Sequence, residues 1–201
     1  MKRKVGILDL NISNVESINS AVKLLGYEVE SFNIDQNFDK YSKIIIPGCG
    51  SFPSAIKNFK KNNIKNKFNN YLKNKSVLGI CLGLQIFTKS SEEFNKSKGL
   101  GILNKKVIKL NFLEKLPNVG FRKIIIKKKN FLFEKISNNS EFYFMHSFGI
   151  LGTSKKDFSS CLKYQKKEII TSISQNNFHG VQFHPEKSGD NGLKYLNNFL
   201  K

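Results

Sequence analysis

The sequence predicts an α/β fold, with a mixed, mostly parallel sheet flanked by helices and an antiparallel extension. In the N-terminal half, short apolar runs alternate with segments whose apolar residues have helical spacing. Such alternation is typical of a parallel sheet that is covered on both faces. The C-terminal half instead contains strand candidates with few helices between them, and it ends in an amphipathic helix.

The elements of the N-terminal half follow from this patterning. Apolar runs predict strands at residues 4–10, 27–32, 43–46 and 76–80. Helical spacing predicts a helix at residues 15–25, one or two surface helices within 55–72, and a helix at 82–88. Gly26 ends the first of these helices, as a glycine after a helix C-terminus commonly does.

The C-terminal half is expected to supply most of the antiparallel strands. Strand candidates lie at residues 100–110, 122–127, 141–148, 160–164, 169–174 and 178–183. The terminal helix, residues 189–201, carries Leu193, Leu196 and Leu200 on one side. Because no internal repeat and no linker rich in Pro, Gly or Ser divides the chain, we expect one domain spanning residues 1–201.

Composition limits the possible classes of function. With 39% hydrophobic and 24% charged residues, the 201-residue chain fits a globular protein, and no stretch approaches the roughly 20 apolar residues that span a bilayer. The first apolar run is too short for a signal peptide and is interrupted by Asp9, so we expect a cytoplasmic protein without a membrane partner. Three irregularly spaced cysteines predict neither a disulfide framework nor a metal site, and we expect no cofactor.

The net charge of +19 raises the question of nucleic-acid binding. The lysines are spread along the whole chain, and only Arg3 and Arg122 are arginines. Proteins that read bases favour arginine, whose planar guanidinium matches guanine edges. We therefore expect no nucleic-acid partner, whereas an acidic protein or a phosphorylated metabolite would suit the basic surface.

One short motif carries a candidate nucleophile. Residues 79–83, Gly-Ile-Cys-Leu-Gly, place Cys81 between a predicted strand and a predicted helix, which is the nucleophile-elbow pattern with Cys in place of Ser. The tight turn excludes bulky neighbours, and the N-terminus of the following helix lowers the pKa of the thiol and can stabilise an oxyanion. Taken alone, the motif fits a core cysteine beside packing glycines equally well.

A nucleophile needs a base, and the chain has three histidines. His184 follows the predicted strand 178–183, and Glu186 comes two residues later. Because residues i and i+2 of an extended chain point the same way, the two side chains could meet if the extended geometry continues. The carboxylate would then fix the imidazole tautomer, and the imidazole would take the thiol proton. We expect His146 and His179 to be hydrogen-bonded structural residues.

A glycine-rich loop follows the strand at residues 43–46. It contains Gly48, Cys49 and Gly50, and glycines allow backbone N–H groups to turn inward and form an oxyanion hole. Taken alone, an ordinary strand-to-helix turn is the better explanation.

Together, these features resemble the triad-type (class I) glutamine amidotransferases, which have a flavodoxin-like fold. More narrowly, the chain is similar to the HisH family, the glutaminase subunits of imidazole glycerol phosphate synthase in histidine biosynthesis. The elbow combined with His-Pro-Glu is specific for the superfamily. The matching segments follow in order along nearly the whole chain, at residues 47–52, 79–85, 98–101, 116–121, 142–147 and 180–189.

The resemblance implies a role for each site residue. Cys81 would attack the side-chain amide of L-glutamine, His184 would move the proton, and Glu186 would orient His184. The loop residues Gly48, Cys49 and Gly50 would supply the oxyanion hole together with the backbone N–H of Leu82. The amino-acid end of the substrate would be held by Gln85, Ser147 and Phe148.

The resemblance also implies a partner. Ammonia would pass through a channel to a synthase subunit, which in this family is a HisF-like (β/α)8 barrel. The residues implied at the interface are Lys187, Asn14, Asn118 and Phe121. Several family positions are altered here: residues 9–14 lack two usual glycines, Asn118, Phe121 and Arg122 replace histidine, tryptophan and asparagine, and Cys49 replaces a small aliphatic residue.

These departures leave the destination of the ammonia more open than its production. A paralogous glutaminase that supplies ammonia to a sugar amidotransferase, for a surface-polysaccharide sugar, is the alternative within the family. A stand-alone cysteine hydrolase and a non-catalytic binding subunit are alternatives of other classes. Gln85 and the spacing of Glu186 speak against the hydrolase, and the intact triad speaks against the binding subunit.

Overall fold

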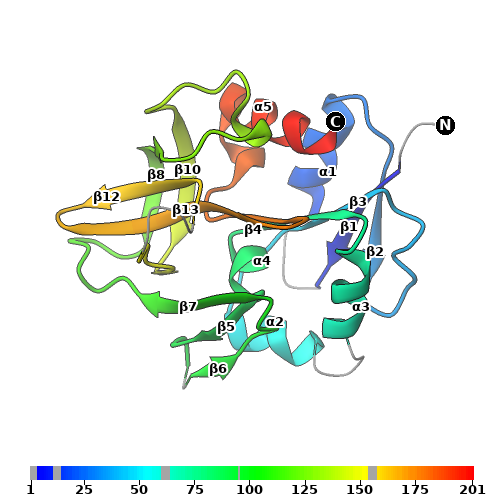
Figure 1. The fold of residues 1–201 in the computed structure, drawn as a ribbon, viewed down its shortest axis with the longest axis horizontal. Coiled ribbons are helices and arrows are strands. Elements are labelled where there is room, and N and C mark those ends of the chain that lie inside the picture. Colours follow the sequence, from blue (N-terminus) through cyan, green and yellow to red (C-terminus); the bar gives the residue numbers. More distant parts are fainter. Residues whose placement is uncertain (1–3, 11–14, 60–63, 95, 154–157) are drawn as a thin grey trace.

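A computed structural model describes residues 4–10, 15–59, 64–94, 96–153 and 158–201. Its centre is an eight-stranded sheet in the order β2-β1-β3-β4-β14-β13-β12-β9 (Figure 1). The strands are β1 (Val5–Asp9), β2 (Val29–Asn33), β3 (Lys43–Ile46), β4 (Ser76–Ile80), β9 (Ile125–Ile126), β12 (Ser160–Tyr164), β13 (Lys167–Gln175) and β14 (Phe178–Val181).

The sheet is parallel on one side and antiparallel on the other. Strands β2, β1, β3, β4 and β14 pair in parallel, whereas β13, β12 and β9 add antiparallel strands next to β14. The predicted fold class is therefore confirmed. Strand β14 inserts beside β4 with Val181 opposite Ile80, so Cys81 and Gln182 leave the sheet at the same edge.

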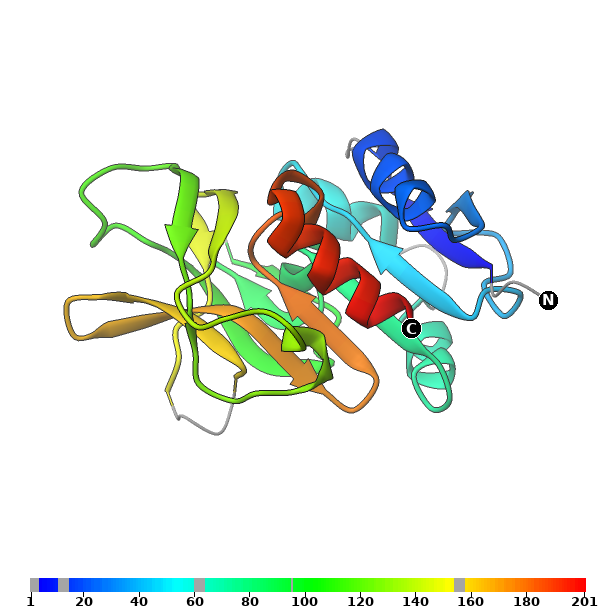
Figure 2. The same ribbon diagram turned by 90° about the horizontal axis from the view of Figure 1, so that it is seen from above.

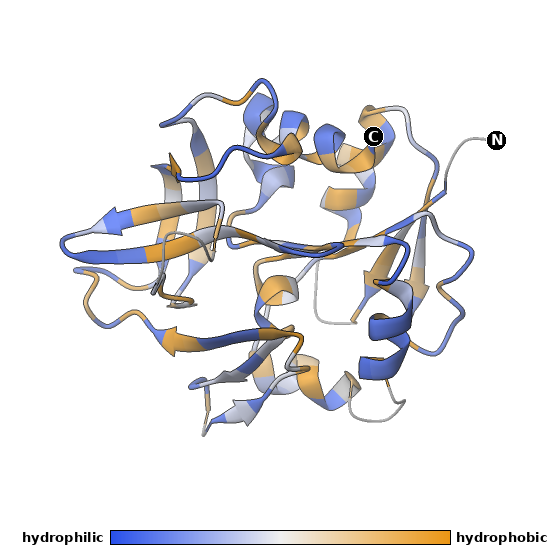
Figure 3. Ribbon diagram, viewed as in Figure 1, coloured by the Kyte–Doolittle hydropathy of each residue, from blue (hydrophilic) through white to orange (hydrophobic). Residues whose placement is uncertain are grey.

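Helices cover both faces of this sheet (Figures 1 and 2). Helices α1 (Val15–Leu24) and α5 (Gly189–Leu200) pack on one face, and α2 (Phe52–Phe59), α3 (Ile64–Tyr71) and α4 (Leu82–Gln85) on the other. The buried side chains accordingly form two clusters, one under each helical layer. Figure 3 shows that α3 is largely hydrophilic, as expected for a surface helix, and only three of its side chains are buried.

Two smaller sheets extend the fold beyond β9 and α4. One has the order β11-β7-β5-β6, and the other pairs β10 with β8. Their strands are β5 (Thr88–Ser91), β6 (Ser97–Lys98), β7 (Leu103–Lys109), β8 (Asn118–Lys123), β10 (Glu141–His146) and β11 (Phe148–Gly149), and two 3-10 helices are η1 (Phe131–Phe133) and η2 (Pro185–Lys187). Within the described residues, no helix is long and apolar enough to cross a membrane.

Some element boundaries differ from those predicted. The helix expected at residues 82–88 ends at Gln85, because the hydroxyl of Thr88 donates to the Gln85 carbonyl at 2.7 Å and Thr88 begins β5. The strand expected at residues 178–183 ends at Val181. Gln182 and His184 therefore lie beyond the end of β14.

Candidate active site

Cys81 occupies a strained turn between β4 and α4. Its backbone has φ 52° and ψ −108°, a left-handed φ that non-glycine residues seldom adopt. Gly79 and Gly83 leave no room for a side chain. A Cβ on Gly83 would lie 1.9 Å from the Ile46 carbonyl oxygen, and one on Gly79 would lie 2.5 Å from the Gly83 oxygen. The turn therefore has the form of a nucleophile elbow.

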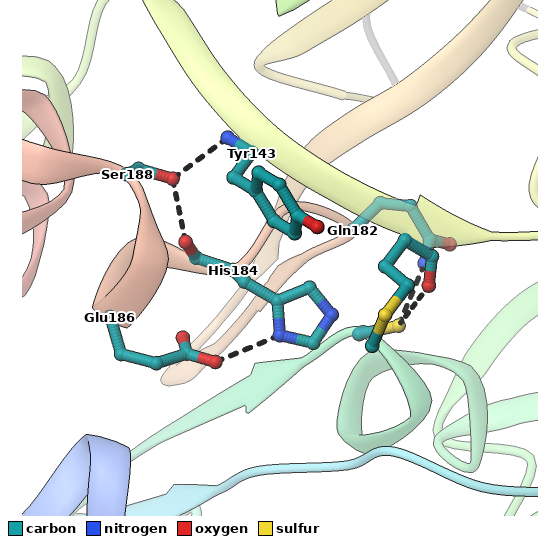
Figure 4. A network of polar contacts seen from close by, with 7 residues as sticks. Tyr143, Gln182, His184, Glu186 and Ser188 are labelled. Carbon is teal, nitrogen blue, oxygen red and sulfur yellow. Dashed lines mark hydrogen bonds and ion pairs between the residues drawn. The ribbon is translucent and has the colours of Figure 1, made fainter. Parts of the chain in front are cut away.

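His184 and Glu186 form a buried pair beside this turn. Nδ1 of His184 donates to Oε1 of Glu186 at 2.8 Å, and their side chains are 1% and 6% exposed (Figure 4). The predicted approach of the two side chains is present, but its reason differs. The chain after His184 turns into η2 rather than continuing extended, and this 3-10 turn brings the carboxylate back to the ring.

The surroundings of His184 favour its charged form. Burial lowers the pKa of His184, but interactions with Cys81 and Glu186 outweigh burial and raise it to about 11. Its Nε2 is buried and has no hydrogen-bond partner within the described residues, and it lies on the edge of the ring that faces away from Glu186 (Figure 4). An imidazolium beside a cysteine favours the thiolate, which is the nucleophilic form.

A cavity of about 240 Å³ opens in front of Cys81. It brings together all the residues that the sequence implicated in substrate and oxyanion binding, namely Gly48, Cys49, Gly50, Leu82, Gln85, Ser147 and Phe148. Four further lining residues were not predicted: Glu93, Pro117, Met145 and His146. The cavity is therefore lined by residues at or after the ends of β3, β4 and β10, together with Glu93 and Pro117 from other parts of the chain.

The expected oxyanion hole is not assembled in this conformation. The backbone N–H of Leu82 donates to the Gly48 carbonyl oxygen at 3.4 Å. The Leu82 N–H, which is expected to bind the oxyanion, is therefore already bonded to the loop that contains Gly48. The same loop is expected to supply the second N–H donor of the oxyanion hole. Forming the hole requires the Gly48 carbonyl to turn away from Leu82.

His146 and His179 are structural, as expected. Nδ1 of His146 donates to the Phe148 carbonyl at 2.8 Å, and its Nε2 accepts from the Asn118 amide at 3.1 Å. Nδ1 of His179 lies 3.0 Å from the Ser174 hydroxyl. Burial lowers the pKa of each of these two histidines to about 4, so both are neutral at physiological pH.

The implied interface residues have different environments. Phe121 is 51% exposed and meets the ring of Tyr143 edge-on at 5.5 Å, and the ammonium of Lys187 lies 6.0 Å from the centre of the same ring. Asn118, by contrast, is buried, and its side-chain amide is hydrogen-bonded to His146. Asn14 lies outside the described residues.

Two polar residues to which we assign a role in the site, Gln182 and Glu93, were not predicted from the sequence. The buried amide of Gln182 donates from Nε2 to Sγ of Cys81 at 3.4 Å. Its place two residues before His184 was a usable signal, because side chains at i and i+2 of an extended chain point the same way. Glu93 lines the cavity from the turn after β5, a strand that the sequence pattern did not reveal.

Comparison with known proteins is consistent with this geometry. Residues 6–201 match the model of the family described as glutamine amidotransferase class-I. The chain belongs to this family. As a class I glutamine amidotransferase it is an enzyme, and the predicted resemblance is confirmed.

Curated relatives align with this amidotransferase over nearly their whole length. It is 39% identical to imidazole glycerol phosphate synthase subunit HisH of Methanocaldococcus jannaschii, over 98% of each chain. It is 36% identical to the HisH subunit of Caldanaerobacter subterraneus subsp. tengcongensis, over 97% of this chain and 96% of the relative. HisH 2 of Methanococcus maripaludis is 35% identical over 98% of each chain.

Solved structures support the fold. A glutamine amidotransferase crystal structure superposes with a TM-score of 0.75 at 17% identity, over 98% of this chain and 97% of the other. PurLQS from Thermotoga maritima gives a TM-score of 0.75 at 19% identity, over 100% and 98%. At these identities the similarity establishes the architecture alone.

Proposed function

We propose that this amidotransferase is the glutaminase subunit of imidazole glycerol phosphate synthase, which releases ammonia from L-glutamine for a synthase partner. The observation that carries the proposal is the full-length similarity to three HisH subunits at 35–39% identity. The buried His184–Glu186 pair beside Cys81 supports glutaminase chemistry, because it supplies a nucleophile, a proton carrier and an orienting carboxylate.

The first half of the reaction forms a thioester. The Cys81 thiolate attacks the side-chain amide carbon of glutamine, and the carbonyl π electrons move to oxygen. The His184 imidazolium then donates its Nε2 proton to the departing nitrogen as the C–N bond breaks, and ammonia leaves. Glu186 stabilises the imidazolium and holds its ring in place throughout.

The second half hydrolyses the thioester. Neutral His184 takes a proton from water, whose oxygen attacks the thioester carbon. Collapse of the tetrahedral intermediate breaks the C–S bond and releases glutamate, and the thiolate–imidazolium pair is restored. Both tetrahedral intermediates require the oxyanion hole, so turnover depends on the Gly48 carbonyl releasing the Leu82 N–H.

The cavity suggests how the amino-acid end of glutamine is held. Both amide hydrogens of Gln85 are already engaged, because its Nε2 donates to the Phe148 carbonyl and to Oε1 of Gln182, each at 3.0 Å. The side-chain carbonyl oxygen of Gln85 is therefore the atom that can accept a hydrogen bond from the α-ammonium of the substrate. Glu93 adds the carboxylate of the cavity lining, and it too favours an ammonium group.

The exposed side of the β8–β10 sheet is the surface we assign to the partner. Cross-strand pairing places Val119 and Phe121 opposite Met145 and Tyr143, and three of these residues are large exposed hydrophobics. Met145 also lines the cavity, so this β8–β10 face adjoins the site where ammonia forms. A HisF-like barrel seated here would keep ammonia from bulk water, with Lys187 at the rim.

Co-expression tests the proposal and its alternative. The chain is co-purified with the HisF-type cyclase or with the sugar amidotransferase of the same genome, and glutamate release from glutamine is measured. We expect a complex and glutamate release with the cyclase. Release only with the sugar amidotransferase would instead assign the chain to polysaccharide-sugar amidation.

A further inference from the structure

Gln182 is fixed in a buried position against the nucleophile. It follows β14 directly and is 0% exposed, and its backbone N–H donates to the Thr171 carbonyl at 2.9 Å. Its side-chain Nε2 donates to Sγ of Cys81 at 3.4 Å. This length is ordinary for an amide donating to sulfur, which has a larger radius than oxygen.

The direction of this hydrogen bond is determined by a backbone carbonyl. The oxygen of Phe148 can only accept, so the atom of Gln85 that faces it must be the amide nitrogen. The same nitrogen faces Gln182 and needs an acceptor there, which makes that atom the Gln182 oxygen. The Gln182 nitrogen must then face Cys81, since a flipped amide would oppose two NH2 groups.

A second branch holds the Phe148 carbonyl in place. The carbonyl also accepts from His146, whose other ring nitrogen accepts from Asn118 on β8. Every side chain along this path is buried. The amide of Gln182 is therefore held by a continuous series of hydrogen bonds and does not depend on solvent for its orientation.

We propose that Gln182 is a further catalytic group, whose amide N–H stabilises the Cys81 thiolate and holds Sγ toward the substrate cavity. The role in catalysis rests on the proposed function; the effect on the thiolate does not. A hydrogen bond to an anion is stronger than one to a neutral thiol, and burial strengthens it further. The donor thus shifts the thiol toward its reactive form before glutamine binds.

Other charged or titratable groups lie around this thiol, and the test must leave them in place. They are His184 and Glu186 with neighbouring Lys187 on η2, His146 at the end of β10, Cys49 in the loop after β3, and Glu93 in the turn after β5. Because these groups are coupled, the pH midpoint of Cys81 reactivity belongs to the whole cluster. A change in that midpoint on altering Gln182 alone reports the amide.

The test is the pH profile of Cys81 alkylation by iodoacetamide in the full chain, without glutamine or partner. Gln182→Met keeps the length of the side chain and removes the donor. We expect its midpoint to rise by about one to two pH units, the effect of losing a hydrogen bond to a charged group.

Thr171→Val is the matched control. The Thr171 hydroxyl on β13 lies 2.7 Å from the Ser160 hydroxyl on β12, and the substitution removes this buried hydrogen bond without touching the bond between Gln182 and Cys81. We expect its midpoint to stay at the wild-type value even if its stability falls. A folded Gln182→Met variant with an unchanged midpoint would overturn the proposal.

A measurement on the wild-type chain covers the case in which Gln182→Met does not fold. The side-chain amide signal of Gln182 in an NMR spectrum should titrate with the midpoint of Cys81 alkylation, whereas that of exposed Gln175 should not. A Gln182 amide signal whose chemical shift does not change over the pH range of Cys81 alkylation contradicts the proposal. Failure to hydrolyse glutamine with any partner would instead count against the proposed function. The two failures are distinguishable because alkylation of Cys81 requires neither glutamine nor a partner.

Discussion

Nδ1 of His184 lies 2.8 Å from Oε1 of Glu186, and the pair is closed by a single 3-10 turn after β14. This contact occupies Nδ1 of the imidazole and leaves Nε2 on the opposite edge of the ring for Cys81. Because both side chains are almost fully buried, the carboxylate stabilises the imidazolium without competition from water. The order of the parallel strands, with β4 beside β14, is what brings the pair to the elbow.

Glu186→Gln should strongly reduce turnover. The amide keeps the shape of the side chain but no longer stabilises the imidazolium, and it permits the wrong tautomer of His184. We expect glutamate release by the complex to fall by about 10²–10⁴-fold, the range for disrupted triads and acid–base groups. Activity within twofold of wild type would show that Glu186 does not orient the base.

Gly83→Ala should destroy the elbow. The added Cβ would meet the Ile46 carbonyl oxygen at 1.9 Å, a backbone atom that cannot move without shifting β3. We expect a loss of several kcal/mol of unfolding free energy, measured by urea denaturation. Gly149→Ala is the control, because its Cβ would meet side-chain methyl groups rather than backbone, those of Leu110 at 3.2 Å and Ile169 at 3.4 Å. Equal stability of the two variants would contradict the packing argument.

Glu93→Gln should weaken glutamine binding. The carboxylate lines the cavity and also accepts from the backbone N–H of Phe52 at 2.8 Å, which the amide oxygen can still do. We expect KM for glutamine to rise by about 10–100-fold, with a smaller change in kcat, as for the loss of one charged hydrogen bond. An unchanged KM would remove Glu93 from the substrate site.

Stability should fall as the pH drops from 6.5 to 5. His146 and His179 have pKa values near 4 in the folded chain, against 6.5 when unfolded, so only the unfolded state gains their protons in this window. Each histidine should cost about 2 kcal/mol over this range. His184 does not oppose the effect, because its raised pKa stabilises the fold below pH 6.5 and that stabilisation is lost only at higher pH.

His179→Phe isolates one of these two contributions. The ring of His179 already packs edge-on against Phe131 and Phe199, so phenylalanine suits the site. Urea denaturation between pH 6.5 and 5 should show about half the wild-type loss of unfolding free energy. A variant with the full wild-type dependence would mean that His179 binds its proton in the folded state.

Phe121→Ala should weaken partner binding. The ring is half exposed on the β8–β10 face and adjoins Tyr143, and aromatic residues often dominate interface energies. We expect the affinity for the cyclase subunit to fall at least about tenfold in a titration. Phe131→Ala is the control, since this equally exposed phenylalanine lies on η1, outside that face. If Phe131→Ala weakens binding and Phe121→Ala does not, the β8–β10 face is not the interface.

Much of the fold was predictable because it depends on local patterns. The strands at residues 43–46, 76–80 and 160–164 have the predicted boundaries, since continuous apolar runs meet clear turn signals there. Strands β5 and β6 were missed, because their sequences are polar: β6 pairs with β5, and β5 in turn pairs with β7. Tertiary contacts, rather than propensity, determine such strands.

The candidate site divides in the same way. The glycines made Cys81 a candidate nucleophile, and the spacing of Glu186 to His184 further along the chain favoured that interpretation over a core cysteine. Asn118 was expected at the interface, but its side chain alternates inward on β8 and binds His146, which the register of β8 with β10 determines. Gln182 and Glu93 were missed, because their roles follow from side-chain contacts across segments that only the fold brings together.

Direct detection of the acyl-enzyme tests the central claim most sharply. The complex with its synthase partner is mixed with isotopically labelled glutamine and quenched in acid, and its peptides are analysed by mass spectrometry. The mechanism predicts a labelled glutamyl group on the peptide that contains Cys81, and none in a Cys81→Ala complex. Label on another residue, or glutamate release that survives Cys81→Ala, would contradict the assignment of Cys81 as the nucleophile.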